Sequence, residues 1–139
     1  MKEKQMNDAE FFAKFESCQL DPSLFDHRAH IRLVWICIDK FGFEETLQKV
    51  QELIKSYVEH LGAFDKYNAT LTVAAINVVF AFMQDSASPE FDEFLKENSD
   101  LLFNFKALIS QHYSFDIFSS KMAASQYIEP DLLPFKSLS

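Results

Sequence analysis

Residues that break helices are scarce in this chain, and they lie where helical periodicity stops. The two glycines, Gly42 and Gly62, each follow a stretch in which apolar residues recur every three or four positions. A glycine in that place usually ends a helix, because it adopts the left-handed backbone conformation without strain. The four prolines also lie outside the periodic stretches. The sequence therefore predicts an all-α protein, a single-domain bundle of about five to six helices over residues 1–139.

Capping residues and periodicity locate the helices. We expect Asn7 to cap the first, with Glu10 as its capping-box partner, and Asp26 to cap the second. The later helices are predicted over 26–41, 43–61, 68–84, a short segment with Pro89 at its first position, 100–112 and 121–126. The segment 68–84 is apolar almost all round, which predicts the central buried helix. Its β-branched residues suggest a strand as the alternative, but the run is longer than a usual strand.

The sixteen phenylalanines predict a core unusually rich in aromatic side chains. Each buried phenylalanine removes about 150–250 Å² from water. Because protein interiors are close-packed, we expect these rings to fill the core rather than to enclose a ligand cavity. Cys18 and Cys37 lie among apolar residues of predicted helices, so we expect structural, reduced thiols.

The formal net charge of −8 makes this an acidic protein. Arg28 and Arg32 are the only arginines, so binding to nucleic acid or to anionic lipid is disfavoured. The longest apolar run, residues 71–83, is too short to span a bilayer, which needs roughly 20 residues. The first twelve residues lack the apolar stretch of a signal peptide. We therefore expect a cytoplasmic protein.

The concentrated site chemistry of the chain is the pair His27 and His30. Their spacing places both imidazoles on one face of the predicted helix 26–41, in line with Ile31 and Val34, so both are expected to point inward. At the first turn of a helix the dipole disfavours the charged imidazolium, which suits a metal ligand or a catalytic proton acceptor. The alternative, with equal weight, is a pair of histidines hydrogen-bonded within the core.

A second polar group, Tyr67, Asn68, Thr70 and Thr72, lies at the start of the predicted helix 68–84. Asn68 is expected to be the N-cap, and Thr72 to bond back to the Asn68 carbonyl. If these groups instead face the two histidines, the set forms a small polar pocket in an aromatic core. His60 and His112 are interpreted as helix-end residues without a nearby partner in the sequence.

The ordered combination of motifs resembles an uncharacterised family of small, all-helical bacterial proteins. That family's pattern reads F-x-H-x-x-H-L, Y-H-x-T-x-T, Y-S and E-P-D-L. The matching residues span about 25–135: Phe25, His27, His30, Tyr67, Thr70, Thr72, Tyr113, Ser114, Glu129, Pro130, Asp131 and Leu132.

The resemblance implies that His27, His30, Thr70, Thr72 and the carboxylates Glu129 and Asp131 gather at one site. Asn68 replaces a histidine of the family pattern, so a three-histidine metal site is not carried over. A set of His27, His30 and Glu129 remains as a site for zinc or iron. Asp131 is the alternative carboxylate, or it orients a histidine, or the Glu129–Leu132 segment is a turn that pins the tail.

These observations leave the activity unknown and do not decide whether the protein is an enzyme. The first hypothesis is an enzyme or metalloprotein in which His27 and His30 act on a small molecule bound by Tyr67, Asn68, Thr70, Thr72 and Asp131. The second is a non-catalytic module that binds a small apolar ligand or a partner protein, including a second copy in a homodimer. The third is a scaffold in which the histidines only join helices. The family pattern slightly favours a ligand-binding or enzymatic site.

Overall fold

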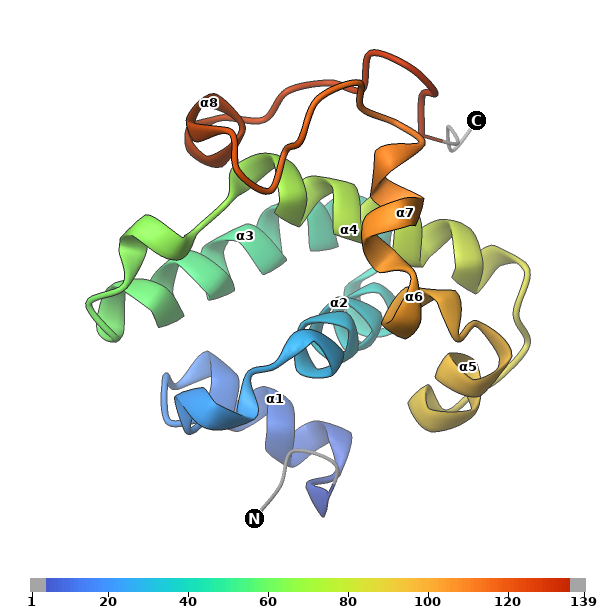
Figure 1. The fold of residues 1–139 in the computed structure, drawn as a ribbon. Helices are drawn as coiled ribbons and strands as arrows, with labels where there is room; N and C mark the ends of the chain where they lie inside the picture. The colour runs from blue at the N-terminus through green and yellow to red at the C-terminus, as the bar shows by residue number, and fades with distance from the viewer. Residues whose placement is uncertain (1–4, 136–139) are drawn as a thin grey trace. The chain divides into compact units, whose positions relative to one another are not determined.

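The computed structural model of the chain describes residues 5–135. Within them the regular structure is entirely helical, with eight α-helices and no strand, which confirms the all-α class (Figure 1). Five of these helices have seven or more residues, close to the predicted number. None of the described helices combines the length and the apolar character needed to cross a bilayer.

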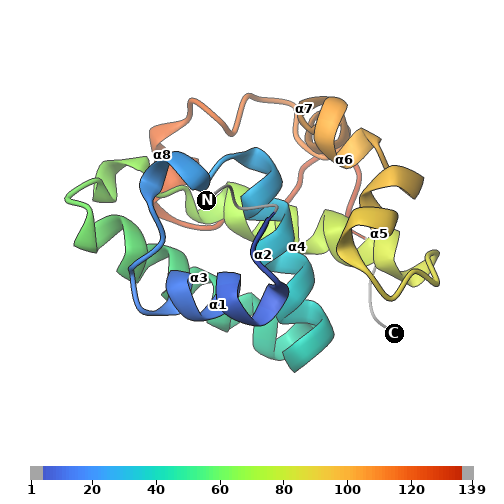
Figure 2. The same ribbon diagram turned by 90° about the horizontal axis from the view of Figure 1, so that it is seen from below.

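The chain divides into two compact units, Met1–Tyr67 and Asn68–Ser139, which we call the first and second units and describe separately. The single-domain prediction stays a prediction. The first unit contains α1 (Asp8–Glu16), α2 (His27–Phe41) and α3 (Phe43–His60), which all contact one another (Figure 2). Two short 3₁₀ turns, Pro22–Leu24 and Phe64–Lys66, complete it.

The predicted caps of the first unit are confirmed. The Asn7 side chain accepts a hydrogen bond from the Glu10 amide at 2.8 Å. The Asp26 side chain accepts a hydrogen bond from the Ala29 amide at 2.9 Å. Each bond satisfies an amide that the first turn of a helix leaves without a partner, so these residues fix where α1 and α2 begin.

Gly42 is the single residue between α2 and α3, and its φ of +80° is in the region that favours glycine. Its amide donates to the Ile38 carbonyl at 2.9 Å, and its carbonyl accepts from the Thr46 amide at 3.1 Å. One residue thus closes one helix and opens the next. The prediction that a glycine ends the helix here is confirmed.

Aromatic rings fill the core of the first unit, as predicted. The ring of Phe15 stacks on Tyr57 with centroids 4.5 Å apart, and Phe25 lies against both. The Tyr57 hydroxyl donates to the Leu20 carbonyl at 2.8 Å, so the one polar atom of the cluster has a partner. Not every phenylalanine is buried: Phe103 of the second unit exposes 77% of its surface.

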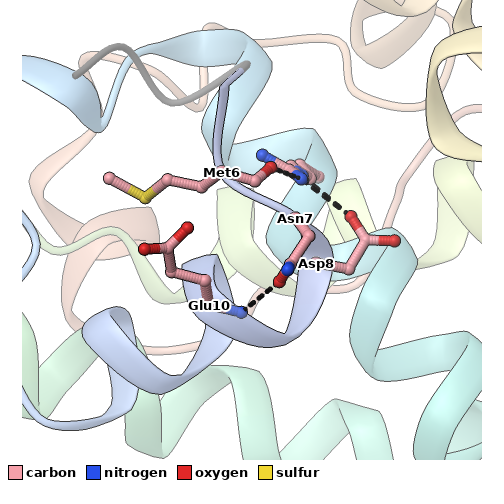
Figure 3. Close-up of polar contacts among 5 residues, drawn as sticks. Met6, Asn7, Asp8 and Glu10 are labelled. Atoms are coloured by element: carbon pink, nitrogen blue, oxygen red, sulfur yellow. Dashed lines mark hydrogen bonds and ion pairs between the residues drawn. The ribbon is translucent and has the colours of Figure 1, made fainter.

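A buried arginine joins α1 to α2. Arg32 donates from Nη2 to the Met6 carbonyl at 2.7 Å and to Asp8 Oδ1 at 2.9 Å, and from Nε to the same oxygen at 3.1 Å. Figure 3 shows the surroundings of Met6 and Asp8, with Asn7 and Glu10 at the cap of α1. The guanidinium also lies 4.8 Å from the ring centre of Phe11. This network attaches the start of α1 to the middle of α2.

The two cysteines differ. Cys37 is buried in α2, and burial raises the pKa of its thiol to about 12, as a structural thiol requires. Cys18 is not on a helix as predicted: it follows the end of α1 with a φ of 62°, and its sulfur lies 3.7 Å from the Ser56 carbonyl oxygen. The predicted helical surroundings of Cys18 are therefore wrong.

The second unit is built on α4 (Ala69–Gln84), which contacts both α7 (Phe105–Ser110) and α8 (Lys121–Ser125) (Figure 1). The helical prediction for residues 68–84 is confirmed and the strand alternative is excluded. The remaining helices are α5 (Phe91–Glu97) and α6 (Asp100–Phe103). The two helices that contact α4 within the second unit are short, with six residues in α7 and five in α8.

Two local predictions in the second unit are wrong. The predicted helix 100–112 is broken at Asn104, which ends α6 and precedes α7 with φ −133° and ψ 28°. Its side chain donates to the Asp100 carboxylate at 2.7 Å, and asparagine has a lower helix propensity than residues such as leucine or lysine. Pro89 does not occupy the first position of α5, which begins at Phe91, where the buried face of that helix starts.

Candidate functional site

The histidine pair lies in the first turn of α2. The His30 amide donates to the Asp26 carbonyl at 3.0 Å, and the Asp26 side chain caps the same turn. Both histidines are exposed, whereas the residues that follow, from Ile31 to Ile38, are buried. The expectation that both are turned away from solvent is therefore wrong for His27, whereas His30 is exposed in part and its ring lies against Phe25. The helical period places them on the face of Ile31, but on that face burial begins only at Ile31.

The His30 ring covers Phe25, and the two ring centres are 3.8 Å apart at an angle of 22°. One face of the imidazole is therefore removed from water while another part of the residue stays exposed. The surrounding protein, and to a smaller extent His27, lower the pKa of His30 to about 4, and the Asp26 carboxylate opposes this. At neutral pH the ring is uncharged, as predicted, but the main cause is desolvation rather than the helix dipole.

The described residues do not supply a metal centre with three ligands. Within residues 5–135 no three His, Cys, Asp or Glu side chains form a group that could hold an ion. In the predicted zinc or iron set, His27 and His30 belong to the first unit and Glu129 to the second. Glu129 is exposed. The proposed metal set therefore stays a prediction without support from a ligand cluster.

The polar residues at the start of α4 hold structure within the second unit. Asn68 caps the helix by accepting from the Leu71 amide at 2.9 Å, and it donates to the Ile117 carbonyl at 2.8 Å. Thr72 donates to the Asn68 carbonyl at 2.8 Å. The interpretation of Asn68 as a cap and of Thr72 as bonded to its own helix is confirmed.

Thr70 is fully buried and makes two long-range bonds. Its hydroxyl donates to the Gln126 carbonyl at 2.9 Å and accepts from the Ile128 amide at 3.0 Å. These bonds attach residues 126–135, which we call the C-terminal segment, to α4. Tyr67 belongs to the first unit, where its hydroxyl donates to Gln51 at 3.3 Å.

Further bonds hold the C-terminal segment along its length. The Tyr113 hydroxyl donates to the Ile128 carbonyl at 2.7 Å. Asp131 accepts from both the amide and the hydroxyl of Ser114, and these two bonds lower the pKa of its carboxyl. The interpretation of Glu129–Leu132 as a turn that holds the tail in place is confirmed for Asp131. The motif residues Thr70, Tyr113, Ser114 and Asp131 thus share one role, to fold the C-terminal segment back within the second unit.

His112 was not predicted as a site residue, and its partners lie more than twenty positions away in the sequence. Its Nδ1 lies 2.6 Å from the Leu133 carbonyl oxygen, and its ring packs on Phe135 with centres 4.4 Å apart. The Leu132 amide donates to the His112 carbonyl at 3.0 Å. The only signal for this contact in the sequence is the apolar run 132–135. That run has no helical or strand periodicity, so the sequence does not indicate which residues it contacts.

These contacts form one wall of a pocket of about 330 Å³ in the second unit, which we call the tail pocket. The other walls come from the C-terminal half of α4 and from α7 with the two residues after it. The apolar lining consists of Val78, Ala81, Phe82, Leu108, Leu133, Pro134 and Phe135. The polar lining consists of Asn77, Asp85, Gln111 and His112.

Comparison with known proteins supplies no relative: no family model, no curated protein and no solved structure matches this chain. The resemblance to the bacterial helical family therefore stays a prediction.

Proposed function

We propose that this protein binds a small, largely apolar molecule in the tail pocket. The observation that carries the proposal is the pocket itself: its volume of about 330 Å³ is within the range of roughly 300–1,000 Å³ found for small-molecule sites. Its lining is mostly apolar with a few polar groups, which is the composition of such sites. This favours the second of the hypotheses drawn from the sequence, a non-catalytic binding module.

The fold gives a physical reason for the pocket. α4 is apolar around most of its circumference, but α7, which contacts it, is only six residues long. Beyond α7, the cover is the irregular segment that ends in Pro134 and Phe135. An irregular backbone does not interdigitate with a helix as closely as a second helix does, so space remains between the large side chains.

The wall made by the C-terminal segment is held in place without a ligand. Leu132 and Leu133 keep 58% and 51% of their surface exposed, so burial of these two side chains does not hold them. The hydrogen bonds to His112 and the bonds of Asp131 to Ser114 hold them instead. A wall that is already ordered lowers the entropy cost of binding.

The test uses a neutral apolar fluorophore, N-phenyl-1-naphthylamine, titrated with the full chain. We expect saturable fluorescence enhancement, and Ala81→Leu should weaken it at least tenfold because the added carbons occupy the pocket. The matched control is Ala87→Leu, which makes the same change at an exposed alanine outside the lining. Equal binding by wild type and Ala81→Leu, or no binding by wild type, would contradict the proposal.

A second candidate is a polar small-molecule site at His27 and His30, as the sequence analysis predicts. The observation that favours it is an exposed His30 whose low pKa leaves it an uncharged hydrogen-bond acceptor. A pKa of about 4 makes it a weak general base at neutral pH, which supports a binding role over a catalytic one. Metal analysis of untagged protein and a Zn²⁺ titration followed by the NMR signals of both rings test this site. Rings that do not respond would exclude its metal form.

A further inference from the structure

We propose that the ligand of the tail pocket is a cation, a protonated amine on an apolar body, and that Asp85 is its charge partner. This inference rests on the proposed function and adds the chemical class of the ligand.

Asp85 places a negative charge where the helix already supplies one. It is the C-cap residue of α4, which has sixteen residues. The carbonyl groups at a helix C-terminus carry a partial negative charge equivalent to about half an elementary charge. The exposed Asp85 carboxylate adds a full charge at the same place, and within residues 5–135 it has no ion-pair partner. A cation bound there interacts favourably with both.

Among the other polar residues of the lining, Asn77 and His112 offer acceptors, and the Gln111 amide offers an acceptor as well as donors. The Asn77 amide nitrogen donates one of its two protons to the Val73 carbonyl at 2.9 Å, and its Oδ1 is an acceptor. A carbonyl oxygen only accepts, so the close contact with Leu133 assigns the Nδ1 proton to His112. In its uncharged form that ring keeps Nε2 as an acceptor. An ammonium group has three donors and no acceptor, which complements this set.

The charge balance of the lining also disfavours an anion. None of the described residues that line the pocket is a lysine or an arginine. A fatty acid or another apolar carboxylate therefore meets Asp85 without a compensating charge. The net charge of −8 for the whole chain acts in the same direction, because it attracts cations and repels anions.

Three probes with the same apolar body test the inference: 4-phenylbutylamine, 4-phenylbutan-1-ol and 4-phenylbutanoate, titrated at pH 7 and low salt by calorimetry. We expect the amine to bind at least tenfold more tightly than the alcohol, and the carboxylate to bind most weakly. Asp85→Asn should remove the preference for the amine and leave alcohol binding unchanged. The control Asp65→Asn changes the net charge equally at an exposed site of the first unit and should retain the preference.

The outcomes separate the two proposals. If the carboxylate binds as well as the amine, or if Asp85→Asn keeps the preference, the charge assignment is wrong while the apolar pocket remains a binding site. If the neutral fluorophore binds but none of the three probes does, the assignment is also wrong. If neither the fluorophore nor the probes bind, both proposals fail. Should Asp85→Asn fold poorly, Asp85→Ser removes the same charge and gives the same readout.

Discussion

His112 donates a hydrogen bond from Nδ1 to the carbonyl oxygen of Leu133, 21 positions later in the chain. The bond is one of several that fold the C-terminal segment back within the second unit, and it lies in the wall of the tail pocket. His112, which the sequence indicates only as a helix-end residue, therefore helps to hold the wall of a candidate ligand site.

Replacing His112 with alanine should loosen this wall. The loss of one hydrogen bond and of the ring contact with Phe135 costs about 1 kcal/mol locally. We expect several-fold weaker binding of N-phenyl-1-naphthylamine and faster amide exchange at Leu132. His60→Ala, at the end of α3 in the first unit, is the matched control and should change neither. Unchanged exchange at Leu132 would show that other bonds hold the wall.

The Thr70 hydroxyl is expected to matter more for stability than that of Thr72. Thr70→Val removes a fully buried group that serves two backbone partners, Gln126 and Ile128. Leaving buried partners unpaired costs about 1–3 kcal/mol. Thr72→Val removes only a bond to a carbonyl of its own helix, so it should cost less than 1 kcal/mol. Urea denaturation of the two variants compares them, and equal losses would contradict the assigned role of Thr70.

The helix ends of the first unit could be predicted because their causes are local. Asn7, Asp26 and Gly42 act on residues no more than four positions away, and each does what its chemistry requires. The all-α class follows from the same short-range signals. Capping and periodicity concern neighbours along the chain, so a single sequence carries the information needed to place them.

The candidate site could not be predicted in the same way. The helical period places His27 and His30 on the face of Ile31, but it does not indicate how far along α2 that face is covered. The tail pocket depends on contacts between α4, His112 and residues 133–135, far apart in sequence. The break at Asn104 was missed because an asparagine is tolerated within a helix and no glycine or proline marks the position.

Arg32 is expected to anchor α1 through the shape of its guanidinium as well as through its charge. Arg32→Lys keeps the charge but cannot reproduce donation from both Nε and Nη2 to Asp8 together with the bond to Met6. We expect a loss of stability on the order of 1 kcal/mol, because Asp8 is half exposed and water screens the pair. Amide exchange at Phe11 and Phe12 should accelerate. Wild-type exchange rates in Arg32→Lys would mean that the charge alone suffices.

The low pKa of His30 predicts a specific loss of stability on acidification. The folded protein holds this imidazole at a pKa of about 4, below the value of about 6.5 expected for an unfolded chain. Between these two values the unfolded chain binds a proton that the folded protein does not, so stability falls as the pH drops from about 6.5 to about 4. Above pH 6.5 both states are neutral at this site, and the stabilising contribution is complete.

His30→Phe isolates this effect from the carboxylates, because it retains a ring against Phe25 and removes the titrating group. The unfolding free energy of the wild type minus that of His30→Phe should fall as the pH drops from 6.5 to 4. Above pH 7 it should stay constant. NMR provides the direct check: the His30 ring should titrate well below 6.5, and His27→Gln should raise its pKa because the His27 charge is the second cause of the shift. A His30 ring that titrates near 6.5 would mean that water on its exposed side outweighs the desolvation by Phe25 and the surrounding protein.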